Sequence, residues 1–180
     1  LSKDYRKKSG VNIKFFKSIS RDDVKKVGGK GSSLGEMFNS GLPIPSGFVI
    51  TTDAYNKPVT QNFEREIIKA FENLKTKRVA VRSSAISEDS KTSSWAGQLE
   101  SYINTTKENL IENIKKCWDS IKSERALTYA SDKNLSKGKL TVAVVVQKMV
   151  NSQVSGVTFT ANPITNNLNE IMIESGFGLG

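Results

Sequence analysis

The segment 142–146 (VAVVV) sets the strongest limit on the architecture of this chain. A strand with one face in water alternates apolar and polar residues, whereas an unbroken apolar run is typical of a strand that is covered on both faces. The chain must therefore supply packing layers on two sides of a sheet. Its 180 residues, of which 37% are hydrophobic and 25% are charged, are enough to bury such a core.

Helical patterns elsewhere in the chain can supply these layers. Ser33 with Glu36, and Thr105 with Glu108, have the spacing of a capping box, which predicts a helix start at each place. Apolar residues at three- and four-residue steps indicate helices within residues 53–78 and 110–121, and further short strands are predicted near residues 48–52, 78–82, 157–161 and 171–173. The predicted fold class is therefore α+β.

The net charge of +9 comes mainly from the start of the chain. Residues 1–30 carry +7, and residues 31–180 carry +2. Because this is a basic segment and not a basic domain, we expect no nucleic-acid partner, although a polyanion-binding module that uses this segment stays open as an alternative. We find no membrane-length apolar run and no signal peptide, so we expect a cytoplasmic protein without a membrane partner.

Two residue types that often carry chemistry are absent or rare. The chain has no histidine, which excludes Ser-His and Cys-His catalysis, histidine metal ligands and a phosphohistidine carrier within it. Its single cysteine, Cys117, excludes an internal disulfide and a multi-cysteine metal site. Cys117 falls on the apolar stripe of a predicted helix, so we expect it to serve packing.

Residues 28–31 (GGKG) are a candidate anion site. They combine unhindered backbone amides, the cation of Lys30 and a helix that follows, which suits a phosphate but also fits a plain tight turn. The segment is not a Walker A loop, because Val24 and Gly31 stand where that motif needs Gly and Ser or Thr.

Three further polar residues have both a functional and a structural interpretation. Arg82 lies where a predicted strand enters the serine-rich loop 83–97, which could wrap a triphosphate or simply be hydrophilic. Arg125 lies on an apolar helix face, where either an ion pair or a phosphate would satisfy it. Gln147 follows the buried run, and its amide could contact an adenine edge.

Six short motifs follow one another along the chain: 27–37 (VGGKGSSLGEM), 41–48 (GLPIPSGF), 81–85 (VRSSA), 96–98 (AGQ), 143–150 (AVVVQKMV) and 155–163 (SGVTFTANP). In this order they closely resemble the N-terminal nucleotide-binding domain of the phosphoenolpyruvate synthase and pyruvate phosphate dikinase family, over roughly residues 15–180. The resemblance implies an ATP-grasp-like fold in which two lobes hold ATP. Residues 1–150 would form the first lobe, with the glycine-rich segment, phosphate loop and hinge, and residues 151–180 the start of a second lobe, truncated within it.

The resemblance also assigns nucleotide contacts to eight residues. These are Lys30 and Arg82 at the phosphates, Gly97 in the loop that covers them, Ser101 where relatives often have threonine, Gln147, Met149 and Val150 at the adenine hinge, and Gly156 at the opening of the second lobe. It places no catalytic and no metal-binding residue within this chain. The implied cofactors are ATP and Mg²⁺, with the metal ligands expected beyond Gly180.

The implied function is that of the ATP-binding part of a phosphoenolpyruvate synthase-like dikinase. Such an enzyme transfers a phosphoryl group from ATP to a histidine on another domain and then to pyruvate on an α/β barrel, so those two domains of the full-length protein are the expected partners. The nucleotide domain of a rifampicin phosphotransferase-like enzyme, or a non-catalytic nucleotide-binding module, stays open as an alternative. The fragment alone is expected to be inactive, and its stretch between Tyr55 and Val79 is shorter than is usual in the family.

Overall fold

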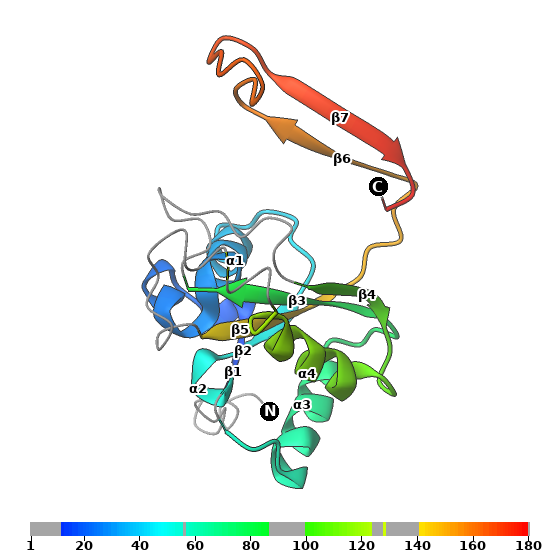
Figure 1. Cartoon of the computed structure of the whole chain (residues 1–180). Helices are drawn as coiled ribbons and strands as arrows, with labels where there is room; N and C mark the ends of the chain where they lie inside the picture. The colour runs from blue at the N-terminus through cyan, green and yellow to red at the C-terminus, as the bar shows by residue number, and fades with distance from the viewer. Residues whose placement is uncertain (1–11, 56, 87–99, 124–127, 129–140, 180) are drawn as a thin grey trace. The chain divides into compact units, whose positions relative to one another are not determined.

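The computed structural model of the chain describes residues 12–55, 57–86, 100–123, 128 and 141–179. The chain forms two compact units, Leu1–Met149 and Val150–Gly180. The first contains a five-stranded sheet with helices, and the second contains a two-stranded hairpin (Figure 1). Helices and antiparallel sheet occur together, which confirms the α+β class. Within the described residues, no helix is both long and apolar enough to cross a bilayer.

The sheet of the first unit has the strand order β1-β2-β5-β3-β4, and every neighbouring pair is antiparallel. Its middle strand, β5, contains the apolar run, and residues 142–146 are completely buried. The two-sided burial predicted for this run is confirmed. The strands are β1 (Ile13–Phe15), β2 (Gly47–Ile50), β3 (Val79–Ala85), β4 (Ser101–Thr105) and β5 (Val142–Lys148).

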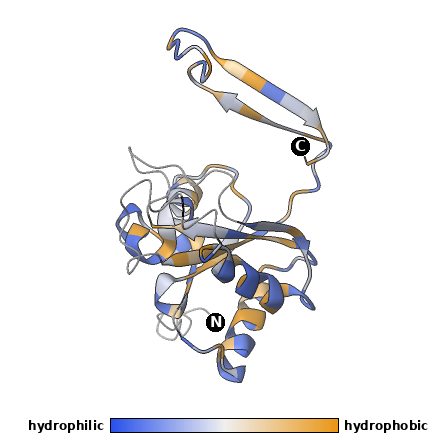
Figure 2. Cartoon of the chain, viewed as in Figure 1, coloured by the Kyte–Doolittle hydropathy of each residue, from blue (hydrophilic) through white to orange (hydrophobic). Residues whose placement is uncertain are grey.

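Helices cover both faces of this sheet (Figure 1). On one side, which we call the α1 face, Val49, Ala143 and Val145 pack in a small core with Val27 of α1. The opposite face carries the larger core, to which α2, α3 and α4 contribute, and Figure 2 shows how apolar and polar residues alternate along α3. The helices are η2 (Phe16–Ser18), η3 (Arg21–Asp23), α1 (Val24–Asn39), α2 (Thr52–Tyr55), α3 (Gln61–Asn73) and α4 (Leu110–Ser120).

Both predicted capping boxes are wrong. α1 already begins at Val24, and Ser33 lies in its interior, because a kink at Gly28 and not a cap at Ser33 sets off the main part of the helix. α4 begins at Leu110, while Thr105 is the last residue of β4. The hydroxyl of Thr105 instead accepts a hydrogen bond from Asn113 Nδ2, 2.9 Å away, so tertiary packing uses the group that the local pattern assigned to a cap.

The second unit consists of the antiparallel strands β6 (Val154–Phe159) and β7 (Met172–Phe177). Both strands occur where the sequence predicted them, with shifted ends. Many of their apolar side chains are exposed, and Phe177 is 94% exposed. Such a hairpin has little core of its own.

Candidate functional site

The kink at Gly28 fits directly against the end of β3. Gly28 has φ 72° and ψ 170°, a backbone conformation that essentially only glycine adopts. A Cβ atom on Gly28 would lie 2.3 Å from the carbonyl oxygen of Ser84. Two separate reasons therefore require glycine at this position: its positive φ angle and the close approach of β3.

Ser84 bonds to both sides of this kink. Its hydroxyl donates to the carbonyl oxygen of Val27 at 2.9 Å and accepts from the amide of Gly31 at 3.1 Å. All these groups are buried. The glycine-rich segment and β3, more than fifty residues apart in the chain, thus form one unit of structure.

Lys30 lies between Val27 and Gly31, the two residues to which Ser84 bonds. Its side-chain Nζ donates a hydrogen bond to the carbonyl oxygen of Ser83 at 2.8 Å. Ser83 directly follows Arg82 in β3. Arg82 pairs with Val145, which packs on the α1 face, and directly paired residues of antiparallel strands project to the same face. The structure therefore brings the Lys30 ammonium next to the strand position whose side chain, Arg82, projects from the α1 face.

Ser83 connects β3 to α4, on the opposite face of the sheet from α1. Ser83 Oγ donates to the carbonyl oxygen of Cys117 in α4 at 3.2 Å and lies 3.3 Å from Ser120 Oγ. Burial raises the pKa of the Cys117 thiol to about 11, so it stays protonated at neutral pH. Cys117 is a packing residue, as the sequence predicted.

Two of the other predicted site residues lie on the same face as Arg82. Ser101 of β4 is paired directly with Arg82 and is exposed. Gln147 is paired with Ala80, two positions before Arg82 in β3, and its Nε2 donates to the carbonyl oxygen of Pro45 at 3.1 Å. Strand alternation puts Ala80 and Arg82 on one face. A row of predicted contacts therefore runs along the α1 face.

The remaining predicted residues are distributed differently. Met149 donates its amide to the carbonyl oxygen of Arg78 at 3.2 Å. Val150 and Gly156 belong to the second unit, where a Cβ atom on Gly156 would meet the carbonyl oxygen of Glu174 at 2.5 Å. Gly97 and Arg125 lie outside the described residues.

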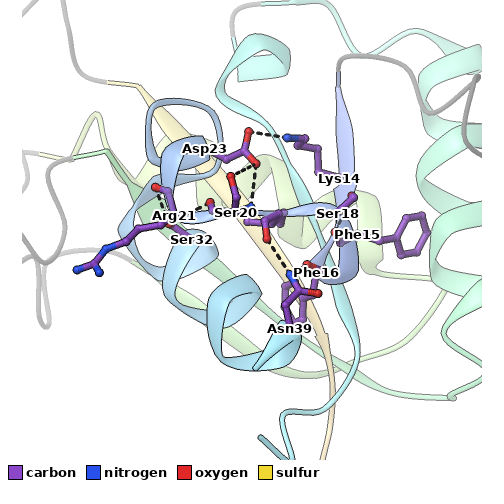
Figure 3. A network of polar contacts seen from close by, with 10 residues as sticks. Lys14, Phe15, Phe16, Ser18, Ser20, Arg21, Asp23, Ser32 and Asn39 are labelled. Atoms are coloured by element: carbon purple, nitrogen blue, oxygen red, sulfur yellow. Dashed lines mark hydrogen bonds and ion pairs between the residues drawn. The ribbon is translucent and has the colours of Figure 1, made fainter. Parts of the chain in front are cut away.

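A polar network anchors the stretch that precedes the glycine-rich segment (Figure 3). Lys14 Nζ is 2.5 Å from Asp23 Oδ1, and the Ser20 amide donates to Asp23 Oδ2 at 3.0 Å. Burial raises the pKa of the Asp23 carboxyl, but the hydrogen bonds from Lys14 and Ser20 outweigh it and hold that pKa below its ordinary value. Further along, Ser32 Oγ donates to the Arg21 carbonyl oxygen at 3.2 Å, and Asn39 Nδ2 bonds to the carbonyls of Phe16 and Ile19.

This arrangement suits an anion. Lys30 and Arg82 are cations. The main part of α1 begins directly after Gly28, so the positive end of this helix dipole lies at the segment that contains Lys30. Charge-assisted hydrogen bonds of this kind are well matched to phosphate. Among the described residues, no cluster of three or more Asp, Glu, His and Cys side chains could hold a metal ion. The geometry can bind a phosphate but offers no metal centre in the described part of the chain.

Two segments, 24–78 and 56–180, match the sequence profile of the pyruvate phosphate dikinase AMP/ATP-binding domain. The chain belongs to this family. The phosphoenolpyruvate synthase of Pyrococcus furiosus is 33% identical over 247 residues, which take in 93% of this chain and 30% of that protein. The phosphoenolpyruvate synthase of Aeropyrum pernix is 36% identical over 216 residues, and the rifampicin phosphotransferase of Bacillus cereus is 34% identical over 208 residues.

This member of the dikinase nucleotide-domain family spans less than a third of the length of these relatives. Its alignment to the Pyrococcus furiosus protein has 247 positions although the chain has only 180 residues, so the relative carries additional residues within the aligned region. The two profile matches share residues 56–78, which places the break in the family pattern there. In the structure, α2 ends at Tyr55 and α3 begins at Gln61.

The sequence of this dikinase-family chain predicted that Ser83 and Ser84 open a serine-rich loop, and this is wrong. Both are buried residues of β3, which extends to Ala85. Ser83 and Ser84 occur in the VRSSA motif, but only the fold reveals that their hydroxyls point to opposite layers, Ser83 to α4 and Ser84 to α1. The serine pair directly after the apolar residues 79–81 and Arg82 was the available signal, since a buried hydroxyl needs a partner.

Proposed function

We propose that this chain is the ATP-binding part of a phosphoenolpyruvate synthase-like phosphotransferase. The observation that carries the proposal is the contact of Lys30 with the carbonyl of Ser83, beside Arg82, in a chain of the dikinase nucleotide-domain family. A site with two cations and a helix start suits the phosphates of ATP. Relatives named phosphoenolpyruvate synthase support this choice of reaction.

In this proposal ATP lies along the α1 face. Its phosphates contact Lys30 and Arg82, with Ser101 beside them and the Gly97 loop over them. Ala80 and Gln147 lie two positions further along their strands, about 7 Å away at the usual rise per residue, which leaves room for the ribose. The adenine then meets residues 147–150, and Gly156 belongs to the second lobe of an ATP-grasp-like fold that this chain holds only in part.

The chain would bind the nucleotide and orient its phosphates, and other domains would complete the reaction. It has no histidine. In this proposal the phosphoryl group passes to a histidine on another domain and from there to pyruvate on a barrel domain. The described residues do not fit a Mg²⁺ site, because they lack a cluster of carboxylates. The family resemblance leads us to expect the metal ligands beyond this chain. A cytoplasmic location is part of this proposal.

The second candidate is the nucleotide domain of an antibiotic phosphotransferase, because the rifampicin phosphotransferase of Bacillus cereus is 34% identical over 92% of this chain. Nucleotide binding is common to both candidates, so the acceptor decides between them. A polyanion-binding module that uses the basic N-terminal segment is a third possibility.

The test uses the full-length protein with ATP and Mg²⁺, and with pyruvate or rifampicin as the acceptor. Formation of AMP, phosphoenolpyruvate and inorganic phosphate supports the proposal, because ATP then loses two phosphoryl groups, one to pyruvate by way of the histidine and one to water. Phosphorylation of rifampicin alone supports the second candidate. Calorimetric titrations with ATP, GTP and duplex DNA at two salt concentrations test the site itself. Saturable ATP binding that exceeds GTP binding is expected from base contacts at residues 147–150. Salt-sensitive DNA binding without ATP binding would overturn the proposal in favour of the polyanion module.

A further inference from the structure

Ser84 is a completely buried residue whose hydroxyl is used twice. It donates to Val27 before the Gly28 kink and accepts from Gly31 after it. A single oxygen atom thus bonds to both ends of the short segment that contains Lys30. Because a buried donor or acceptor without a partner is costly, removal of this oxygen would leave two backbone groups unsatisfied.

The contact between Gly28 and Ser84 also sets the distance between α1 and β3. Gly28 approaches the carbonyl of Ser84 so closely that no Cβ atom would fit, and Lys30 reaches the carbonyl of Ser83 in the adjoining peptide. Arg82 lies two residues before Ser84 in β3. The position of the Lys30 ammonium relative to Arg82 therefore depends on how the kinked segment is held against β3.

We propose that Ser84 is a positioning residue for the phosphates, an inference that rests on the proposed function. Its hydroxyl holds the segment 27–31 in the conformation that keeps Lys30 beside Arg82 before any nucleotide binds. Ordering a long cationic side chain and a glycine-rich segment at the moment of binding would lower affinity, so a site assembled in advance binds more tightly.

If Ser84 had a purely structural role, loss of another buried hydroxyl nearby should weaken ATP binding equally. Ser32 supplies this matched control. Like Ser84, Ser32 is a buried serine, only 4% exposed, but it belongs to α1. Its hydroxyl donates to the carbonyl oxygen of Arg21 at 3.2 Å. Its bonds reach η3 and not β3. Ser32→Ala therefore removes a comparable buried hydroxyl near Lys30 without releasing the segment from the strand.

The experiment compares the full-length wild type, Ser84→Ala, Ser84→Cys and Ser32→Ala. Amide hydrogen exchange over residues 27–31 is measured without nucleotide, and the Kd for ATP is measured by calorimetry. In Ser84→Ala we expect exchange of the Gly31 amide to accelerate about tenfold and the Kd to rise about tenfold. Ser84→Cys keeps a weak donor and should lie in between, while Ser32→Ala should keep its Kd within about twofold of wild type.

Unchanged exchange at Gly31 in Ser84→Ala would show that the hydroxyl does not hold the segment. Faster exchange with an unchanged Kd, or an equal loss of affinity in Ser32→Ala, would overturn the positioning role. If Ser84→Ala does not fold, Ser84→Cys decides by the same two measurements. A wild-type protein that binds no ATP would overturn the proposed function, whereas the exchange comparison would still decide whether Ser84 holds the segment.

Discussion

The Lys30 ammonium donates a hydrogen bond to the carbonyl oxygen of Ser83, 2.8 Å away, although 53 positions separate the two residues in the chain. This bond orients the ammonium toward β3. The bond also joins the glycine-rich segment to the strand that presents Arg82. Two motifs that are separate in the sequence thereby become parts of one surface.

Removal of either cation should weaken ATP binding. A charge-assisted hydrogen bond to phosphate contributes about 1.5–3 kcal/mol, so Lys30→Met and Arg82→Gln should each raise the Kd for ATP about tenfold or more. Titration calorimetry on the full-length protein measures this effect. Lys26→Met is the control, because Lys26 is an exposed lysine of the same helix and its loss changes the net charge equally. Equal losses in Lys26→Met and Lys30→Met would mean that only the overall field matters.

Sequence periodicity predicted the sheet core well but not the helix ends. Residues 142–146 are buried on both faces of the sheet, and an unbroken apolar run predicts such burial directly. The capping pattern at Ser33 failed because the start of the helix depends on a distant strand. Gly28 adopts its kink where Ser84 can bond to both sides of it.

The sequence gives a list of candidate site residues, which stays a prediction, and it does not predict how they are arranged. Lys30 and Arg82 stand out by charge beside glycine and serine, and the resemblance to the family predicts that both contact phosphates. Nothing local in the sequence indicates that Lys30 would bond to the Ser83 carbonyl, since that contact depends on the packing of α1 against β3. The same holds for Gln147, whose amide nitrogen is oriented by the carbonyl of Pro45, 102 positions away.

Gly28→Ala should destabilise the protein strongly. The backbone conformation of Gly28 costs a residue with a Cβ atom about 1–3 kcal/mol, and the contact of 2.3 Å with the Ser84 carbonyl adds a steric cost. Gly41→Ala separates the two effects, because Gly41 also has a positive φ, 80°, but nothing lies within 4 Å of its Cβ position. Urea denaturation should show a loss of about 1 kcal/mol for Gly41→Ala and about 3 kcal/mol or more for Gly28→Ala. Similar losses in both variants would contradict the close packing against β3.

Asp23 should make stability depend on pH in the acidic range. Its pKa is held below the ordinary value of 3.8, so its contribution is present at neutral pH and is lost as the pH falls through the lowered pKa. Asp23→Asn should therefore destabilise the protein by about 1 kcal/mol at pH 7, and the difference from wild type should shrink below pH 4. Urea denaturation at a series of pH values measures it. Asp22→Asn, at an exposed neighbour, controls for the change in charge, and a difference that grows toward low pH would refute the assignment.

The 180-residue chain alone should transfer no phosphoryl group from ATP to pyruvate. It contains no histidine to receive the phosphoryl group, and its described residues hold no cluster of carboxylates for the metal that such a transfer requires. Its relatives are more than three times as long. The assay incubates the purified chain with ATP, Mg²⁺ and pyruvate and follows AMP and phosphoenolpyruvate. Turnover close to that of the full-length protein would show that the acceptor and metal residues lie within this chain after all. Activity that returns when the rest of the full-length protein is added in trans would support the assignment of this chain to the nucleotide site, because the added part would then supply the histidine and the metal ligands while Lys30 and Arg82 hold the phosphates.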